Sequence, residues 1–262
     1  MDVVVCVKQV PDTTNIKVDP ETGTLKRETA GTILNPFDLY AIEEGLRIKE
    51  KLGGKVTVIT MGPPMAKEIL KTAIAMGADE AVLISDKRVA GSDTWATSYV
   101  LSKAIQKLGF NLVLFGKQAI DGDTAQVGPS TAEFLKIPCI TWVKKIREIS
   151  DKEMVAEMMM EDGVDVVKVS IPVAITVVKD INSPRLESLK GKMRAKKYEP
   201  AIWTIDDIGA EEAKAGLKGS PTRVKQTWSP QRDFGHAEIF QGETEEKVAK
   251  LYEKLKSMGL IK

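Results

Sequence analysis

The residues with the clearest chemical potential lie in a polar loop between an apolar run and an expected helix. The apolar run 111–116 is followed by the sequence KQAIDGDTAQVGPS. A helix that starts behind such a loop offers an anion its unpaired backbone N–H groups and about half a positive charge. Glycines in the loop permit close backbone approach, and Thr124 and Gln126 add a hydroxyl and an amide. These residue types favour a site for a phosphate group.

Two aspartates in this loop, Asp121 and Asp123, complicate that interpretation because a carboxylate repels a phosphate. Aspartate is nevertheless a preferred turn and cap residue, since its carboxylate accepts backbone N–H groups of its own loop while other N–H groups face the ligand. The loop contains neither the Walker pattern nor G-x-G-x-x-G. An ordinary capped turn therefore stays open beside a nucleotide site.

The remaining composition offers little other chemistry. Two cysteines, Cys6 and Cys139, and one histidine, His236, are too few for a Cys/His zinc site or a disulfide framework, so we expect the reducing cytoplasm. With 38 basic and 37 acidic residues the net charge is +1, which gives no reason to expect nucleic acid or an anionic membrane as partner. The apolar run 3–7 is too short to insert across a membrane and predicts a first strand. Neither a catalytic triad nor a catalytic carboxylate pair is evident.

Strands and helices alternate in the first half of the chain and must position the loop. Apolar runs predict strands that are buried on both faces at 3–7, 55–62, 81–85 and 111–116. Helical patterns lie between them, the first with Asn35 as N-cap, Pro36 at its first position and Gly53 beyond its end. The other two helices are predicted within 65–79 and 92–109. This alternation predicts right-handed crossovers and a parallel sheet.

The second half of the chain has a different pattern. Segments 153–160, 164–171 and 173–179 predict a meander that adds antiparallel strands. From about residue 183 the sequence is charged and irregular, before a last amphipathic helix within 243–259. We expect a nucleotide-binding α/β domain at 1–220 and a C-terminal arm at 221–262. Such an arm buries little by itself, so it would lie on a partner or fold back on its own domain.

Five segments carry a resemblance that covers nearly the whole chain. They are VCVKQVPD, NPFD, AMGAD, GKQAIDGDTAQVGP and INSPRLESLKGKMRAKK. Together they resemble the β subunit of electron-transfer flavoproteins. The resemblance implies an α/β fold of adenine-nucleotide α-hydrolase-like type, with a three-layer parallel sheet, added antiparallel strands and an extended C-terminal arm. It also implies a heterodimer with an α subunit that holds one FAD and takes up the arm.

Three further segments resemble the electron-bifurcating branch, in which a second FAD replaces the AMP of the β subunit. They are DGDTAQVGP, GSDTWATS and GLKGSPT. That branch implies hydride transfer from NADH, with electrons passed to ferredoxin or flavodoxin and, through the α-subunit FAD, to an acyl-CoA, lactate-type or other dehydrogenase. A non-bifurcating β subunit that holds AMP is the alternative. A stand-alone nucleotide-binding sensor of universal-stress type is a third interpretation, which the extra strands, the basic loop and the long arm disfavour.

The resemblance implies a nucleotide at the carboxyl edge of the sheet, with its phosphates on the loop. The implied cofactor-binding residues are Cys6, Val7, Asn35, Pro36, Phe37, Asp38, Thr60, Met61, Gly62, Thr94, Thr97, Asp121, Gly122, Asp123, Thr124, Ala125, Gln126, Val127 and Gly128. Thr94 and Thr97 would lie toward the flavin or its ribityl chain, although both could equally serve a helix start. Phe37 would approach the α-subunit flavin or belong to the core. Thr13 stands where some members carry an aromatic residue, so no flavin stacking is expected there.

A basic loop at 184–200 is implied to dock partner dehydrogenases. The implied docking residues are Leu189, Met193, Lys192 and Arg194. An apolar anchor ringed by positive charge suits a transient contact, because electrostatic steering raises the association rate and a small anchor keeps dissociation fast. A solvated charged loop without a partner is the alternative.

Overall fold

The computed structural model describes the chain except for residues 13–16, 19–24, 27–30, 226–236 and 262. Thr13 and His236 therefore lie outside the described residues. The chain separates into two compact units, residues 1–223 and 224–262. The first unit contains the sheet and the loop, and the second contains α7 (Thr244–Ser257).

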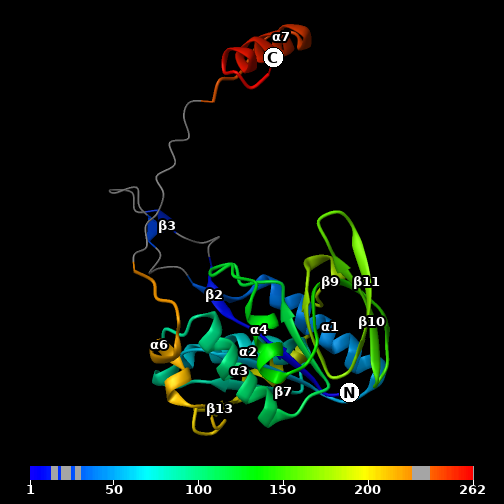
Figure 1. Ribbon diagram of the computed structural model, residues 1–262, viewed down its shortest axis with the longest axis vertical. Coiled ribbons are helices and arrows are strands. Elements are labelled where there is room, and N and C mark those ends of the chain that lie inside the picture. The colour runs from blue at the N-terminus through cyan, green and yellow to red at the C-terminus, as the bar shows by residue number, and fades with distance from the viewer. Residues whose placement is uncertain (13–16, 19–24, 27–30, 226–236, 262) are drawn as a thin grey trace. The chain divides into compact units, whose positions relative to one another are not determined.

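A mostly parallel sheet organises the first unit (Figure 1). Its order within the described residues is β11-β10-β9-β12-β8-β1-β6-β7-β13. The strands are β1 (Val3–Cys6), β6 (Val56–Met61), β7 (Glu80–Ile84), β8 (Leu112–Gly116), β9 (Cys139–Ile149), β10 (Glu153–Met159), β11 (Val164–Ser170), β12 (Val173–Val177) and β13 (Ala201–Trp203). All neighbours pair in parallel except in β9-β10-β11, where the pairing is antiparallel. The predicted α/β class with added antiparallel strands is confirmed.

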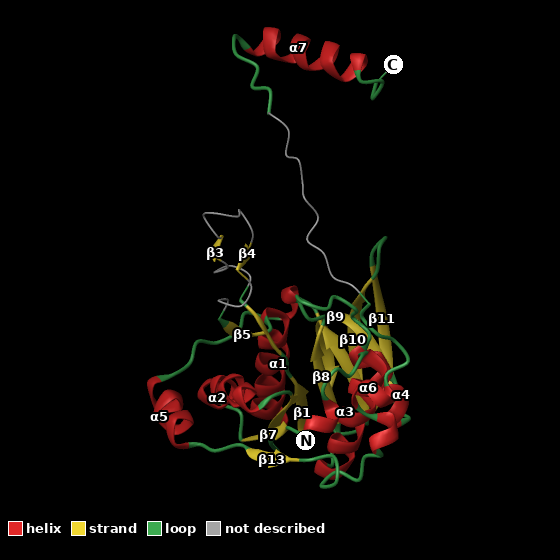
Figure 2. Cartoon of the chain, turned by 90° about the vertical axis from the view of Figure 1, so that its left-hand side faces the viewer, coloured by secondary structure: helices red, strands yellow, loops and turns green. Residues whose placement is uncertain are grey.

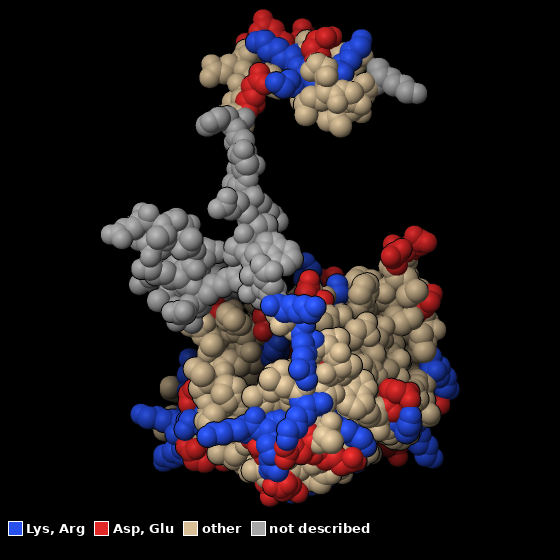
Figure 3. Space-filling model, turned by 60° about the vertical axis from the view of Figure 1, so that its left-hand side comes forward, with Lys and Arg blue, Asp and Glu red and all other residues tan. Residues whose placement is uncertain are grey.

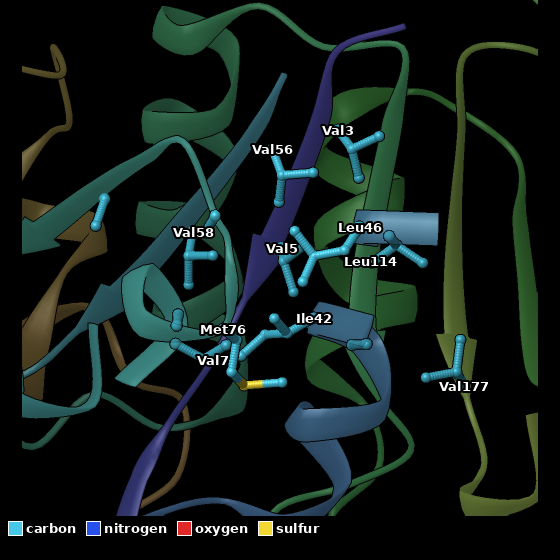
Figure 4. Close-up of a cluster of buried hydrophobic side chains, with 14 of the residues drawn as sticks. Val3, Val5, Val7, Ile42, Leu46, Val56, Val58, Met76, Leu114 and Val177 are labelled. Atoms are coloured by element: carbon cyan, nitrogen blue, oxygen red, sulfur yellow. The ribbon is translucent and has the colours of Figure 1, made fainter. Parts of the chain in front are cut away.

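Helices cover both faces of this sheet and give three layers (Figure 2). One face carries α1 (Pro36–Leu52), α2 (Lys67–Met76) and α5 (Leu189–Lys197), and the other carries α3 (Thr94–Leu108) and α4 (Val127–Leu135). Alternate residues of β1 enter the two cores, which explains why the strand is apolar throughout. Val5 and Val58 lie with Ile42 and Leu46 in the α1-side core (Figure 4).

The other described elements are short. They are β2 (Gln9–Pro11), β3 (Lys17–Val18), β4 (Leu25–Lys26), β5 (Thr32–Leu34), η3 (Pro64–Ala66), η4 (Lys87–Val89), η5 (Lys179–Ile181), η6 (Glu212–Lys214) and α6 (Gly216–Gly219). In the part of the chain that the structure describes, no helix combines the length and apolar character needed to cross a membrane.

Two expectations for the second half are wrong. The segment 173–179 does not extend the meander, because β12 lies between β8 and β9 and pairs in parallel with both. The charged segment 184–200 is not a plain loop, because it contains α5. Close packing on α2 fixes this helix: a side chain at Gly191 would overlap the Ala75 carbonyl. Arg194 and Tyr198 then bind the backbone of Asp79 and Ala81 at 2.6 and 2.8 Å.

Candidate functional site

The loop 117–126 begins where three central strands end side by side. β1, β6 and β8 are parallel neighbours that end at Cys6, Met61 and Gly116. Gly116 admits no side chain, since a Cβ there would overlap the Asp38 carboxylate and approach the Phe37 carbonyl carbon to 2.7 Å. The loop therefore starts in direct contact with the first turn of α1. This edge is where open parallel sheets bind ligands.

Asn35 joins the loop to the end of β1. It occupies the predicted N-cap position of α1, but its side chain makes no capping hydrogen bond. Instead its amide donates to the Gln118 carbonyl at 2.9 Å and accepts from the Ile120 N–H at 3.3 Å. Its backbone N–H donates to the Lys8 carbonyl at 2.9 Å. Asn35 thus holds the loop rather than the helix end.

Asp38 lies beneath the loop as a buried carboxylate. Its Oδ2 accepts the Lys8 backbone N–H at 2.8 Å, and the carboxylate also accepts the Gly116 backbone. Burial raises the pKa of Asp38 to about 7, against the lowering effect of these hydrogen bonds. Burial, with a smaller contribution from the Asp38 charge, also raises the pKa of the Cys6 thiol. Asp38 ties the ends of β1 and β8 together.

Two loop residues adopt left-handed backbone conformations that favour glycine. Asp123 has φ of 55° and Ala125 has φ of 54°. For alanine this conformation costs roughly 1–2 kcal/mol. Gln126 follows in a right-handed conformation, with φ of −107° and ψ of −9°. A left-handed residue next to a right-handed one makes successive N–H groups converge, which forms a concave site for an anion.

Both loop aspartates are paired with side chains of the site. Lys8 Nζ donates to Asp121 Oδ1 at 2.7 Å and Oδ2 at 2.9 Å, and Gln118 Nε2 donates to Asp123. The expectation that the carboxylates would accept N–H groups of their own loop is therefore corrected, because side chains are the donors. The aspartates still shape the loop, and their charge does not exclude an anion nearby.

The start of α3 lies against the same loop. Asp93 caps this helix by accepting the Ala96 N–H at 3.0 Å, so Thr94 is not the cap. Thr94 Oγ1 lies 3.4 Å from Thr124 Oγ1. The segments GSDTWATS and DGDTAQVGP therefore meet at this point. Thr97 is half-buried one turn further along α3.

The other predicted site residues differ in exposure. The buried ones are Cys6, Val7, Thr60 and Gly128. The half-buried ones are Phe37, Met61, Gly62, Ala125 and Val127, and the exposed ones are Pro36, Gly122 and Gln126. Gly128 packs closely, since a Cβ there would lie 2.6 Å from Thr176 Cγ2. Thr60 Oγ1 is buried without a hydrogen-bond partner among the described residues.

Sequence reasoning missed Lys8, Gln118 and Trp142. Lys8 is the second residue after β1, so its position at the carboxyl edge could have been noticed. Trp142 adopts φ of 54° in β9, where its N–H donates to Thr176 Oγ1 at 2.9 Å. The ammonium of Lys117, at the start of the loop, lies 4.4 Å from the centroid of the Trp142 ring. No sequence signal distinguished this tryptophan.

The predicted docking residues lie on α5, which packs against α2. Leu189 is 77% exposed and Met193 62% exposed, while Leu186, just before the helix, is 91% exposed. Lys192 pairs with Glu187 at 3.4 Å. Arg194 is used structurally, through its bond to the Asp79 carbonyl. Figure 3 shows Lys and Arg side chains gathered over the lower part of one face of the first unit.

A family model and several known proteins are similar to the chain over most or all of its length. The family model for the electron transfer flavoprotein domain matches residues 9–208. The chain is 48% identical to the electron transfer flavoprotein subunit beta of Thermoanaerobacterium thermosaccharolyticum over 262 residues, which cover 100% of both chains. It is 47% identical to the caffeyl-CoA reductase-Etf complex subunit CarD of Acetobacterium woodii, again over 100% of both chains. It is 44% identical to Protein FixA of Bradyrhizobium diazoefficiens, over 87% of this chain and 82% of that protein.

Proposed function

This chain belongs to the electron transfer flavoprotein family as a β subunit, and from that premise we propose that it binds FAD at the loop 117–126. As part of a heterodimer with an α subunit, it would accept hydride from NADH and bifurcate the electrons. One electron would go to ferredoxin or flavodoxin, and the other through the α-subunit FAD to a dehydrogenase. We expect this complex in the cytoplasm.

The observation that carries the proposal is the left-handed backbone of Ala125 followed by the right-handed Gln126, a combination that suits an anion, at the carboxyl edge of the central strands. The residues present fit a nucleotide. Thr60, whose buried hydroxyl has no hydrogen-bond partner among the described residues, lies near the end of β6, and the exposed Gly122 leaves the loop backbone without a side chain at that point. Thr94 and Thr124 bring two hydroxyls to the same place.

The residues of the chain would bind and orient the cofactor rather than perform acid–base chemistry. The N–H groups of 124–127 would hold its phosphates, and Thr94 and Thr97 would lie toward its flavin end. When bound, FAD supplies the exchange between two-electron and one-electron transfer. Asp38 and Asn35 would keep the strand ends and the loop in register, so that the anion site does not have to form on binding.

The name of one relative supports the choice of partner. CarD is described as a subunit of a caffeyl-CoA reductase-Etf complex. We propose that this chain likewise serves an oxidoreductase that acts on a CoA ester, such as an acyl-CoA dehydrogenase, with a lactate-type dehydrogenase as the alternative. The exposed side chains of Leu189 and Met193 would dock it, and the positive charges of Lys192 and its neighbours would steer it.

The second compact unit would bind the α subunit. Several apolar side chains of this unit are exposed, namely Ile239, Val248, Leu251, Tyr252, Met258 and Leu260. An amphipathic helix with an uncovered apolar side is a common means of binding a partner. The predicted arm at 221–262 would then belong to the heterodimer interface.

A β subunit that holds AMP is the second candidate, because the loop would bind the phosphate of either nucleotide. The sensor interpretation is dropped, since β subunits match the chain along its whole length. The test is anaerobic reduction of ferredoxin by NADH with the purified heterodimer, its dehydrogenase and that enzyme's oxidised substrate. Bifurcation predicts that ferredoxin is reduced only when the oxidised substrate is present. If NADH is not oxidised and ferredoxin is not reduced even with the oxidised substrate present, the AMP form is favoured.

A further inference from the structure

Lys8 is fixed by two hydrogen bonds of its backbone, and its side chain extends to the loop. Its N–H donates to Asp38 Oδ2 at 2.8 Å, and its carbonyl accepts the Asn35 N–H at 2.9 Å. These two bonds fix its Cα at the end of β1. The side chain is 48% exposed and crosses to the loop, where the ammonium meets Asp121.

The ion pair between Lys8 and Asp121 contributes little to the stability of the fold. Asp121 is 30% exposed, and pairs between partly exposed groups typically contribute less than about 1 kcal/mol. The position of the pair is more informative. A Cβ at Gly122 would have Lys8 Nζ as its nearest atom, at 3.8 Å, so the ammonium lies over a residue without a side chain. A cation over bare backbone at the edge of a concave N–H site is well placed for an anionic ligand.

The other charged groups of the loop are engaged elsewhere. Lys117 lies over the Trp142 ring, and Asp123 accepts the amide of Gln118. Lys8, which reaches the loop from the end of β1, is therefore the cation whose partner is an exposed carboxylate that an anion can replace. An ammonium has three donors, so it can also bind a phosphate oxygen while it stays near Asp121.

We propose that Lys8 binds a phosphate of the nucleotide and that Asp121 competes with that phosphate for the Lys8 ammonium. This inference rests on the proposed function, because it assumes a nucleotide at the loop. Lys8 and Asp121 then have opposite effects on phosphate binding. A purely structural ion pair would instead give the same effect when either partner is removed.

The experiment compares AMP with adenosine, which differ only in the phosphate. The heterodimer with the α subunit is depleted of bound nucleotides and titrated calorimetrically with each probe. Lys8→Gln is expected to weaken AMP binding about five- to tenfold and to leave adenosine unchanged. Asp121→Asn is expected to strengthen AMP binding by about two- to fivefold. Lys55→Gln is the matched control, because Lys55 pairs with Glu80 at 3.0 Å and lies at the opposite edge of the sheet.

The outcomes separate this inference from the proposed function. If the wild-type heterodimer binds AMP while Lys8→Gln matches Lys55→Gln, the role of Lys8 is wrong and the nucleotide site stands. If both Lys8→Gln and Asp121→Asn weaken AMP and adenosine equally, the pair only shapes the loop, and the inference is again overturned. If neither AMP nor FAD binds to the depleted wild-type heterodimer, the proposed function itself fails. Any binding of the probes to the α subunit contributes equally to the titrations of all these heterodimers, because they share the same α subunit.

Discussion

Removing the buried charge of Asp38 should change how stability depends on pH. The pKa of this carboxyl rises from its ordinary value of 3.8 to about 7 through burial. Folded protein therefore holds the proton more tightly than unfolded chain, so the contribution of Asp38 to stability is greatest below pH 3.8. That contribution decreases as the pH rises from about 4 to 7, by about 4 kcal/mol in total.

The variant Asp38→Asn does not titrate, so it lacks this loss. An amide oxygen can still accept one backbone N–H, but the amide nitrogen would face the second donor, which costs roughly 1–3 kcal/mol at every pH. We expect Asp38→Asn to be less stable than wild type at pH 5 and to gain about 3 kcal/mol relative to wild type between pH 5 and pH 8.

The assay is urea unfolding of the heterodimer at pH 5, 6, 7 and 8, followed by tryptophan fluorescence. Because the comparison uses the difference between variant and wild type at each pH, the other titrating groups cancel. A difference that stays constant from pH 5 to 8 would refute the raised pKa and the buried position of the Asp38 charge.

Three further perturbations test the packing at Gly116, the docking role of Leu189 and the role of the second compact unit. Gly116→Ala places a Cβ against a buried carboxylate and should lower the unfolding temperature and the nucleotide content, at a cost of about 1–3 kcal/mol; Gly163→Ala, where nothing lies within 4 Å, is the control, and equal behaviour of the two would contradict the close packing. Leu189→Ala should lower the rate of electron transfer to the dehydrogenase on the order of tenfold, without changing flavin content. Ile202→Ala, an exposed apolar residue on β13, is its control, and an unchanged rate for Leu189→Ala would exclude docking through this side chain. Truncation after residue 223 should leave the first compact unit folded and abolish co-purification with the α subunit; retained co-purification would show that the second unit is not needed for the heterodimer.

The sequence was most informative where local patterns and burial agree. The β-branched run of β1 and the Asn35, Pro36 and Gly53 signals of α1 predicted those elements nearly to their ends. α5 was missed because its sequence is charged and contains Gly191, and its helical state depends on close packing against α2. The parallel pairing of β12 was missed because strand direction is set by contacts distant in sequence.

The candidate site was predicted in outline only. The resemblance supplied the loop, and the structure brings Thr94 next to Thr124. The partner of Asp121 is Lys8, and this pairing depends on how β1 and β8 lie side by side, whereas the partner of Asp123 is Gln118 of the same loop. The pairing with Lys8 follows from the three-dimensional arrangement and not from spacing along the chain.

FAD binding by the β subunit is tested most directly by the cofactor content of the heterodimer purified after co-expression with its α subunit. Bound cofactors are released with acid, separated by chromatography and quantified against protein. We expect a second FAD beside that of the α subunit, and no AMP. A single FAD accompanied by AMP would contradict the claim and identify the complex as a simple electron carrier.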